Sequence, residues 1–116
     1  MSVNMDFWQV MSELSATKPI TLDRRRGSAH PRYPDLTYPL NYGYLEDTFA
    51  SDGGGIDVWI GSKEDNKTLT GILCTFDTLK RDAEIKLLIG CTLEDVETIR
   101  KFSSYMATLF IPNPTV

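Results

Sequence analysis

The central segment of the chain, residues 24–55, is rich in proline and glycine and shows no helical period. Such a segment is either a disordered linker or an ordered functional loop. It contains Tyr33, Tyr38, Tyr42 and Tyr44, and aromatic residues are scarce in disordered segments. We therefore predict a long, well-packed loop broken by short strands, of the kind that often carries an active site.

Regular elements are predicted on both sides of this loop. Before it, apolar spacing predicts a helix over residues 5–16 that starts at Asn4 or Asp6, followed by a short strand over 20–23. After it, alternation predicts strands over 56–61, 68–76 and 84–89, with residues 77–82 as a hairpin loop. Residues 92–95 form a capping box that opens a C-terminal helix. The expected fold class is α+β, with a small curled sheet or barrel as its core.

Two of these elements have a predicted inner face. In the strand over 56–61, alternation places Asp57 and Trp59 on one face and the three aliphatic residues on the other. In the C-terminal helix, the positions expected to point inward are Val96, Ile99, Phe102 and Met106.

The bulk properties bound the class of protein. A chain of 116 residues suits a single domain, spanning residues 1–116. Its net charge of −4 argues against nucleic-acid or anionic-membrane binding, which needs a basic surface, and suits carboxylates gathered around cations. Only Cys74 and Cys91 occur, which suits reduced thiols. Without an apolar run of membrane-spanning length or a targeting pattern, the expected location is the cytoplasm.

Four aspartates stand at or near predicted strand ends, in two pairs: Asp52 with Asp57, and Asp77 with Asp82. Mg²⁺ prefers oxygen ligands, commonly one or two carboxylates together with substrate phosphate. Two loops that each offer an aspartate pair predict a metal site if they meet over one face of a small sheet. The alternative is that these are turn residues, because aspartate is common where a strand stops. The run Gly53–Gly55 is likewise either a tight turn or a close approach to an anion.

Basic and tyrosine side chains are candidate phosphate contacts. Arg24–Arg26 and Arg32 offer planar groups that suit phosphate oxygens; the alternative is a solvated strand edge. The tyrosine hydroxyls either bond phosphate or belong to the core. His30, the only histidine, is interpreted as structural or as a secondary phosphate contact. No nucleophile elbow, Cys/His arrangement or phosphate loop is present in the sequence.

Together these segments resemble the soluble, metal-dependent inorganic pyrophosphatases of the single-barrel family. The tightest match is Tyr38–Tyr44, which is similar to the family's Y-P-x-N-Y-G-Y/F block. Asp52–Val58 follows at the family's distance and resembles D-G-D-x-x-D-V. Upstream, Asp23–Ser28 is similar to E-I-P-K-G-S, and downstream Asp77 and Asp82 match the outer acids of D-E-x-x-x-D. The resemblance covers roughly residues 20–90.

The resemblance implies a fold, a cofactor and a reaction. The fold would be a five-stranded barrel of the oligonucleotide-binding type, here with an N-terminal and a C-terminal helix. The reaction would be hydrolysis of pyrophosphate to two phosphates by a water activated by Mg²⁺, with Mn²⁺ as a possible replacement. By position, the implied metal ligands are Asp52, Asp57, Asp77 and Asp82. The implied catalytic residues are Asp57, Tyr42 and Asp52, and the implied substrate contacts are Arg26, Arg32, Tyr42, Lys86 and Tyr105.

The sequence also departs from the family pattern. Gly54 replaces the middle aspartate, which is the family's candidate base, and Thr78 replaces the glutamate after Asp77. Glu84 stands where a lysine is expected, although Lys86 lies one strand period further on and is predicted to face the same side. These departures leave an alternative function: a module that binds metal and phosphate, or a nucleotide, without catalysis. A homo-oligomer is expected from the apolar stripes on the helices.

Overall fold

The computed structural model describes residues 6–65 and 67–116, which form two helices and six strands. Their bounds, in chain order, are α1 (Phe7–Thr17), β1 (Ile20–Arg24), β2 (Asn41–Leu45), β3 (Ile56–Ile60), β4 (Leu69–Asp77), β5 (Asp82–Ile89), α2 (Leu93–Phe102) and β6 (Ala107–Pro112). The α+β class is confirmed, and each predicted helix and strand is present with its ends shifted by a few residues.

The six strands form one mixed sheet in the order β1-β2-β3-β5-β4-β6. All neighbouring strands are antiparallel except β3 and β5, which run parallel over Val58–Ile60 and Leu87–Ile89. A barrel requires its first and last strands to pair, but β1 and β6 are the two open edges of this sheet. The six-stranded sheet is therefore not closed, and the predicted five-stranded barrel is not shown; the sequence interpretation also missed β6.

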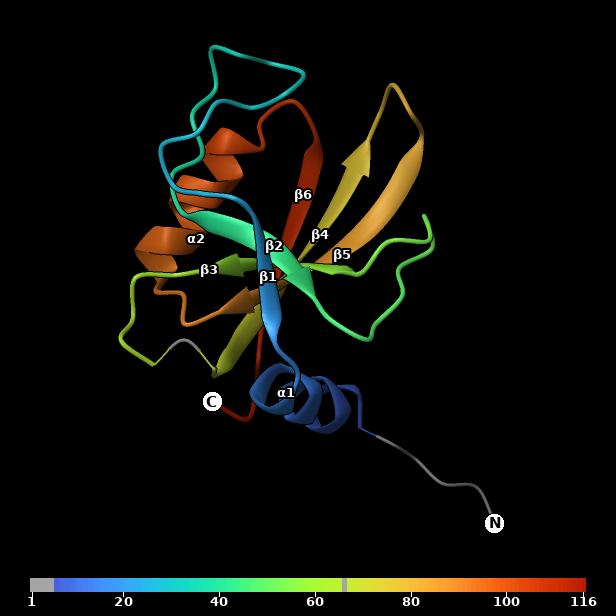
Figure 1. Cartoon of the computed structure of the whole chain (residues 1–116), viewed down its shortest axis with the longest axis vertical. Helices are drawn as coiled ribbons and strands as arrows, with labels where there is room; N and C mark the ends of the chain where they lie inside the picture. Colours follow the sequence, from blue (N-terminus) through green and yellow to red (C-terminus); the bar gives the residue numbers. More distant parts are fainter. Residues whose placement is uncertain (1–5, 66) are drawn as a thin grey trace.

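Each helix covers one face of the sheet (Figure 1). On one face, Trp8, Met11 and Leu14 of α1 pack on an aliphatic core formed by β2, β3, β4 and β5. On the other face, α2 packs on a core that is rich in aromatic rings and includes Tyr38 and Trp59. The predicted alternation in β3 is confirmed, because Val58 and Trp59 belong to these two different cores.

Local signals explain where the helices begin and end. The side chain of Asp6 accepts a hydrogen bond from the Trp8 N–H at 2.9 Å and caps α1; the other predicted cap, Asn4, lies outside the described residues. The predicted capping box of α2 is confirmed, with Thr92 and Asp95 bonded reciprocally. Helix α2 ends at Phe102, where the Ser103 N–H bonds the Ile99 carbonyl, so Met106 is not on its inner face as predicted.

The predicted ordered loop is confirmed in residues 25–40. The Gly27 N–H donates to the Tyr38 carbonyl at 2.8 Å, and the Tyr38 N–H donates to the Ser28 carbonyl at 2.9 Å. A third bond joins the His30 N–H to the Leu36 carbonyl. These bonds hold the two halves of the segment together and fix where the chain enters β2. Neither helix in the described part of the chain has the length and apolarity needed to cross a membrane.

Candidate functional site

Strands β3 and β5 pair in parallel only at their C-terminal ends and diverge toward their N-terminal ends. We call this divergence the fork, and it creates the candidate site. Their pairing spans only Val58–Ile60 against Leu87–Ile89. The first half of β5 instead continues as a hairpin with β4, from Thr75 opposite Glu84 to Asp77 opposite Asp82. In Figure 1 the β4–β5 hairpin extends away from β2 and β3. Side chains near the point of divergence can therefore approach one another from both strands.

Lys86 stands at the base of the fork, immediately before the first β5 residue paired with β3. Lys86 is only 7% exposed. Its ammonium donates to Tyr42 Oη at 2.8 Å, Asp57 Oδ2 at 3.1 Å and Glu84 Oε2 at 3.2 Å. Three donated bonds satisfy all three ammonium hydrogens. Two carboxylates thus share one buried cation, and we call Tyr42, Asp57, Glu84 and Lys86 the fork cluster. The prediction that Glu84 and Lys86 face the same side is confirmed.

Tyr42 is the neutral member of the fork cluster. Burial raises the pKa of its hydroxyl, and the negative charge of the neighbouring Asp57 raises it further. The hydroxyl therefore keeps its proton at physiological pH. Its ring contacts Trp59 edge-on, with the ring centres 4.7 Å apart, and this contact fixes the hydroxyl at the base of the fork. Tyr42 is thus suited to orient a ligand by hydrogen bonding, not to remove a proton.

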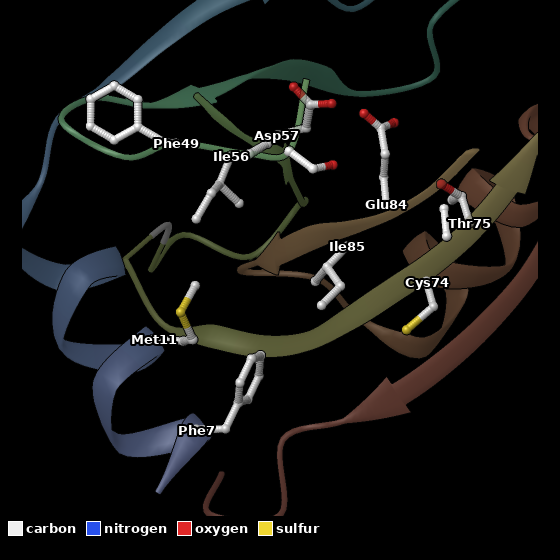
Figure 2. A pocket seen from close by; sticks show the side chains of 12 residues that line it. Phe7, Met11, Phe49, Ile56, Asp57, Cys74, Thr75, Glu84 and Ile85 are labelled. Atoms are coloured by element: carbon white, nitrogen blue, oxygen red, sulfur yellow. The ribbon is translucent and has the colours of Figure 1, made fainter. Parts of the chain in front are cut away.

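A cleft of about 510 Å³ opens beside the fork cluster (Figure 2). Asp57, Glu84 and Thr75 line it, and in Figure 2 Glu84 lies between the other two. The rest of the wall is largely apolar. It comes from α1, from β3, β4 and β5, and from the loop 46–55, with Phe7, Met11, Phe49, Ile56, Cys74 and Ile85 as its larger side chains. The wall of the cleft therefore combines a few polar groups with a larger apolar surface.

The loop 46–55 carries the first predicted aspartate. Asp52 is exposed, and its Oδ1 accepts a hydrogen bond from the Gly54 N–H at 2.9 Å. The turn closes through the Ala50 N–H bonded to the Gly54 carbonyl, and Gly53 has φ 89°, a left-handed conformation that favours glycine. The glycine run is thus a tight turn here. Ala50 and Ser51 line the cleft, whereas Asp52 is not among its lining residues.

The second predicted pair, Asp77 and Asp82, lies at the tip of the β4–β5 hairpin. The two residues face each other across the strands, one period beyond Thr75 and Glu84. Asp77 Oδ1 accepts the Leu79 and Lys80 N–H groups at 2.9 and 3.0 Å, so it caps the hairpin turn. These bonds, that of Lys80 foremost, hold the pKa of Asp77 below its usual value. Its Oδ2 lies 3.6 Å from the Arg32 guanidinium.

His30 is buried, and its ring fixes the loop that carries both His30 and Arg32. Its Nδ1 accepts the backbone N–H groups of Arg32 and Tyr33 at 3.0 and 3.1 Å, so the neutral ring carries its proton on Nε2. Nε2 lies 3.1 Å from the hydroxyl of Tyr105 and donates to it. Burial lowers the pKa of His30, and the charges of Arg24, Arg32 and Lys80 lower it further. We call His30, Arg32, Asp77, Asp82 and Tyr105 the hairpin cluster.

The predicted site residues thus divide between two clusters and two separate exposed positions. Tyr42, Asp57 and Lys86 meet in the fork cluster, while Arg32, Asp77, Asp82 and Tyr105 lie in or beside the hairpin cluster. Arg26 is exposed in the turn after β1, where its backbone N–H donates to the side-chain oxygen of Asn41. Asp52 is exposed in the loop 46–55. The sequence interpretation missed Glu84 and Thr75 as site residues. Alternation along β4 and β5 is the signal that would have placed both beside Lys86.

The implied Mg²⁺ or Mn²⁺ can be compared with the donor set of the fork cluster. Asp57 and Glu84 offer carboxylate oxygens that already hold one cation, the Lys86 ammonium. Within residues 6–65 and 67–116, no three His, Cys, Asp or Glu side chains are grouped closely enough to hold a metal ion alone. Mg²⁺ is often bound by one or two carboxylates with substrate phosphates as further ligands. Any divalent cation at the fork cluster would therefore need phosphate or water oxygens to complete its ligands.

Comparison with known proteins adds no assignment. No protein-family model matches the chain, and no curated protein matches it. The resemblance of Tyr38–Tyr44 and Asp52–Val58 to soluble inorganic pyrophosphatases therefore stays a prediction.

Proposed function

We propose that this chain is a metal-dependent hydrolase of phosphoanhydrides and that inorganic pyrophosphate is its substrate. The observation that carries the proposal is the fork cluster: Asp57 and Glu84, from different strands, hold one buried ammonium and also line a cleft. The resemblance of Tyr38–Tyr44 and Asp52–Val58 to the pyrophosphatase family supports the same reaction.

Lys86 and Tyr42 are the proposed phosphate contacts. All three hydrogens of the Lys86 ammonium are bonded to oxygen atoms of the protein, so one of these bonds is exchanged when the ammonium contacts a phosphate oxygen. Tyr42 remains protonated and donates a hydrogen bond. Such preorganised donors stabilise charge that develops on a phosphate during the reaction, and losing one costs roughly two to three orders of magnitude in rate.

Asp57 is the proposed proton acceptor, since Gly54 supplies no carboxylate at the position of the family's candidate base. Its side chain is partly exposed to the cleft, and only one of its oxygens is bonded to Lys86. The water oxygen forms a bond to phosphorus, the bridging P–O bond breaks, and the proton from water passes by way of Asp57 to the departing phosphate. A divalent cation, when bound, would acidify that water and neutralise phosphate charge.

Phosphate release from pyrophosphate, with Mg²⁺ or Mn²⁺, tests this proposal. We expect turnover by the wild type, a large loss in Asp57→Asn and in Glu84→Gln, and no change in Asp35→Asn, which alters an exposed carboxylate away from the cleft. Absence of turnover in the wild type, or full activity in Asp57→Asn, would contradict it.

A second candidate is a module that binds metal and phosphate without hydrolysis. It is favoured by a specific observation: the Lys86 ammonium already neutralises Asp57 and Glu84, the two carboxylates that would otherwise be free to bind a divalent ion. Calorimetry distinguishes the two candidates. Metal-dependent binding of pyrophosphate with no release of phosphate supports the module, whereas binding with turnover supports the hydrolase.

The proposal includes a setting for the protein. Cys74 and Cys91 are free thiols, which supports a reducing compartment such as the cytoplasm. A homo-oligomer is supported by neighbouring strands that expose Phe76 and Leu109 on the same face as Ile85. Sedimentation velocity on the purified chain tests the oligomer, and a strictly monomeric species would remove it from the proposal.

A further inference from the structure

The two open edges of the sheet are built differently. Strand β1 carries Asp23 and Arg24, and its pairing with β2 is irregular between Leu22 and Arg24. Charged side chains and irregular pairing keep an edge strand from pairing with another chain. Strand β6, with the sequence ATLFIP, contains no charged residue, and its only proline is its last residue. Its register with β4 is regular from end to end, so this edge lacks the protection that β1 has.

The backbone of β6 has hydrogen-bonding groups on its open side. The Asn113 N–H bonds the Thr70 carbonyl at 3.0 Å, and in an antiparallel pair every second residue then bonds the same neighbour. The residues between them, Thr108 and Phe110, therefore turn their N–H and C=O groups away from β4. Pro112 occupies the next such position, where its missing N–H costs no bond to β4. A strand added to this edge would bond Thr108 and Phe110.

The side chains of β6 extend an apolar surface to the same edge. Cys74 of β4 lies opposite Ile85 of β5 on one side and opposite Leu109 of β6 on the other. Phe76 and Ile111 lie on this face in the neighbouring rows. These apolar residues other than Cys74 are 37% to 59% exposed, and Leu109, at the open edge, is the most exposed of them. A contiguous exposed apolar surface of this kind is typical of an interaction site.

A second copy of the chain fits this edge in shape and in charge. A two-fold axis perpendicular to the sheet sets two β6 strands antiparallel and joins their apolar surfaces. The strands bring no charge to the contact, although each chain has a net charge of −4. The same axis reverses α2, whose first turn is acidic and whose last turn is basic, so opposite charges lie toward each other on the two copies. Arg100 of α2 donates to Thr108 Oγ1 at 3.2 Å, which places the basic end of this helix near β6.

We propose that two copies of this chain join through antiparallel β6 strands, with the two-fold axis at Leu109. Thr108 of each copy then forms a hydrogen-bonded pair with Phe110 of the other, which satisfies the open N–H and C=O groups of both residues. Leu109 faces Leu109 of the other copy in the close pair without hydrogen bonds, and Ala107 faces Ile111. The pairing rests on the homo-oligomer of the proposed function, to which it gives a strand, a symmetry and a register.

The residues that flank β6 favour this register over its neighbours. An axis at Phe110 would pair Thr108 with Pro112, which has no N–H to donate. An axis at Thr108 would pair Phe110 with Met106, which lies before the strand begins. Only the axis at Leu109 uses the two residues of β6 that have both groups open.

Sedimentation velocity with Leu109→Lys tests the pairing. Lysine is tolerated in the single chain because Leu109 is 59% exposed there, but in the dimer two like charges would meet at the axis. We expect the dissociation constant of the dimer to rise about 100-fold, with the circular dichroism spectrum of the wild type. Leu79→Lys is the matched control. Leu79 is 74% exposed in the turn of the β4–β5 hairpin, so this change should leave the dimer as in the wild type.

Cysteine cross-linking tests the register. The variants Leu109→Cys and Ile111→Cys are made together with Cys74→Ala, because Cys74 is the β4 neighbour of Leu109. Paired residues at the axis are close enough for a disulfide, whereas two copies of Ile111 lie several residues apart along the strands. With diamide as the oxidant, we expect a covalent dimer from Leu109→Cys and at least tenfold less from Ile111→Cys.

The outcomes separate the pairing from the rest of the proposed function. A purified chain that is strictly monomeric overturns both the pairing and the homo-oligomer. An oligomer that persists in Leu109→Lys overturns the pairing alone, because its interface then lies elsewhere. Equal cross-linking at Leu109 and Ile111, or none at Leu109, also overturns it. Pyrophosphate turnover is measured on the same samples, so the proposed hydrolase is tested separately from the dimer.

Discussion

The fork cluster and the hairpin cluster contain the same kinds of residue but use them differently. In the fork cluster, Asp57 and Glu84 both accept a hydrogen bond from one buried ammonium, and both line an open cleft. In the hairpin cluster, one oxygen of Asp77 accepts hydrogen bonds from two backbone N–H groups, and the other lies near the exposed side chain of Arg32. Carboxylates near strand ends can therefore face an open cleft or bond a turn, and the partners of each oxygen distinguish the two cases.

The largest expected effect comes from removing the shared cation of the fork cluster. In Lys86→Met the stem is kept, but Asp57 and Glu84 lose their common partner and repel each other. We expect a loss of about 3 kcal/mol in the free energy of unfolding, as for other broken buried ion pairs, together with loss of activity. Urea unfolding measures the stability. Lys80→Met, an exposed lysine of the hairpin, should be close to wild type; equal losses in both variants would contradict a special role for Lys86.

The second prediction sets one aspartate from each cluster against the other. Asp57→Asn should lower kcat/KM for pyrophosphate by roughly two orders of magnitude, since it removes a charge directed at the reacting phosphate. Asp77→Asn should lower the thermal midpoint by weakening the turn cap and leave kcat/KM nearer to wild type. Steady-state kinetics and thermal unfolding of both variants check this. Equal losses of activity would show that the two clusters act as one site.

A smaller effect is expected from metal added to the lysine variant. Without the ammonium, the oxygens of Asp57 and Glu84 are free to bind Mg²⁺, and an ion that binds only the folded chain raises its stability. The thermal midpoint of Lys86→Met should therefore rise with Mg²⁺ concentration more than that of the wild type. The double variant Lys86→Met, Asp57→Asn is the control, and an equal rise in all three proteins would point to nonspecific ion effects.

The smallest effect concerns pH and the hairpin cluster. Because the folded chain lowers the pKa of His30, the unfolded chain binds the proton more readily. The contribution of neutral His30 is complete above pH about 6.5 and is lost as the pH falls through the lowered pKa of the folded chain. His30→Asn keeps an acceptor for the Arg32 and Tyr33 N–H groups and cannot titrate. Its stability should vary less between pH 7 and 5 than that of the wild type, which unfolding at each pH measures.

The elements that the sequence predicted are those with local signals. The alternation of Ile56–Ile60 and the capping box of Thr92 and Asp95 each depend on residues within one turn or one strand. The fork was not predictable in this way, because it depends on β5 pairing with β3 and not with a nearer neighbour in the chain. The metal site was predicted from spacing, but spacing does not show that Asp77 Oδ1 faces a turn.

The cleft also required information that one segment does not carry. Its apolar wall combines Phe7 from the first helix with Ile85 from the fifth strand, so no window of sequence contains it. The strand β6 was missed because Met106 was assigned to the preceding helix, which ends at Phe102. By contrast, alternation with Lys86 could have placed Glu84 in the cluster. The sequence interpretation treated Glu84 only as the replacement of an expected lysine.

The packing of α1 on the sheet has a consequence for how the chain folds as it is synthesised. Trp8, Met11 and Leu14 are made early, but the β4 and β5 residues that cover them are made much later. Asn113 then joins the end of β6 to both Ser12 of α1 and the Leu69 carbonyl, so the two ends of the chain are fixed together last. A nascent chain that stops before β4 leaves the apolar face of α1 without most of the residues that cover it, and it should be recovered in the insoluble fraction.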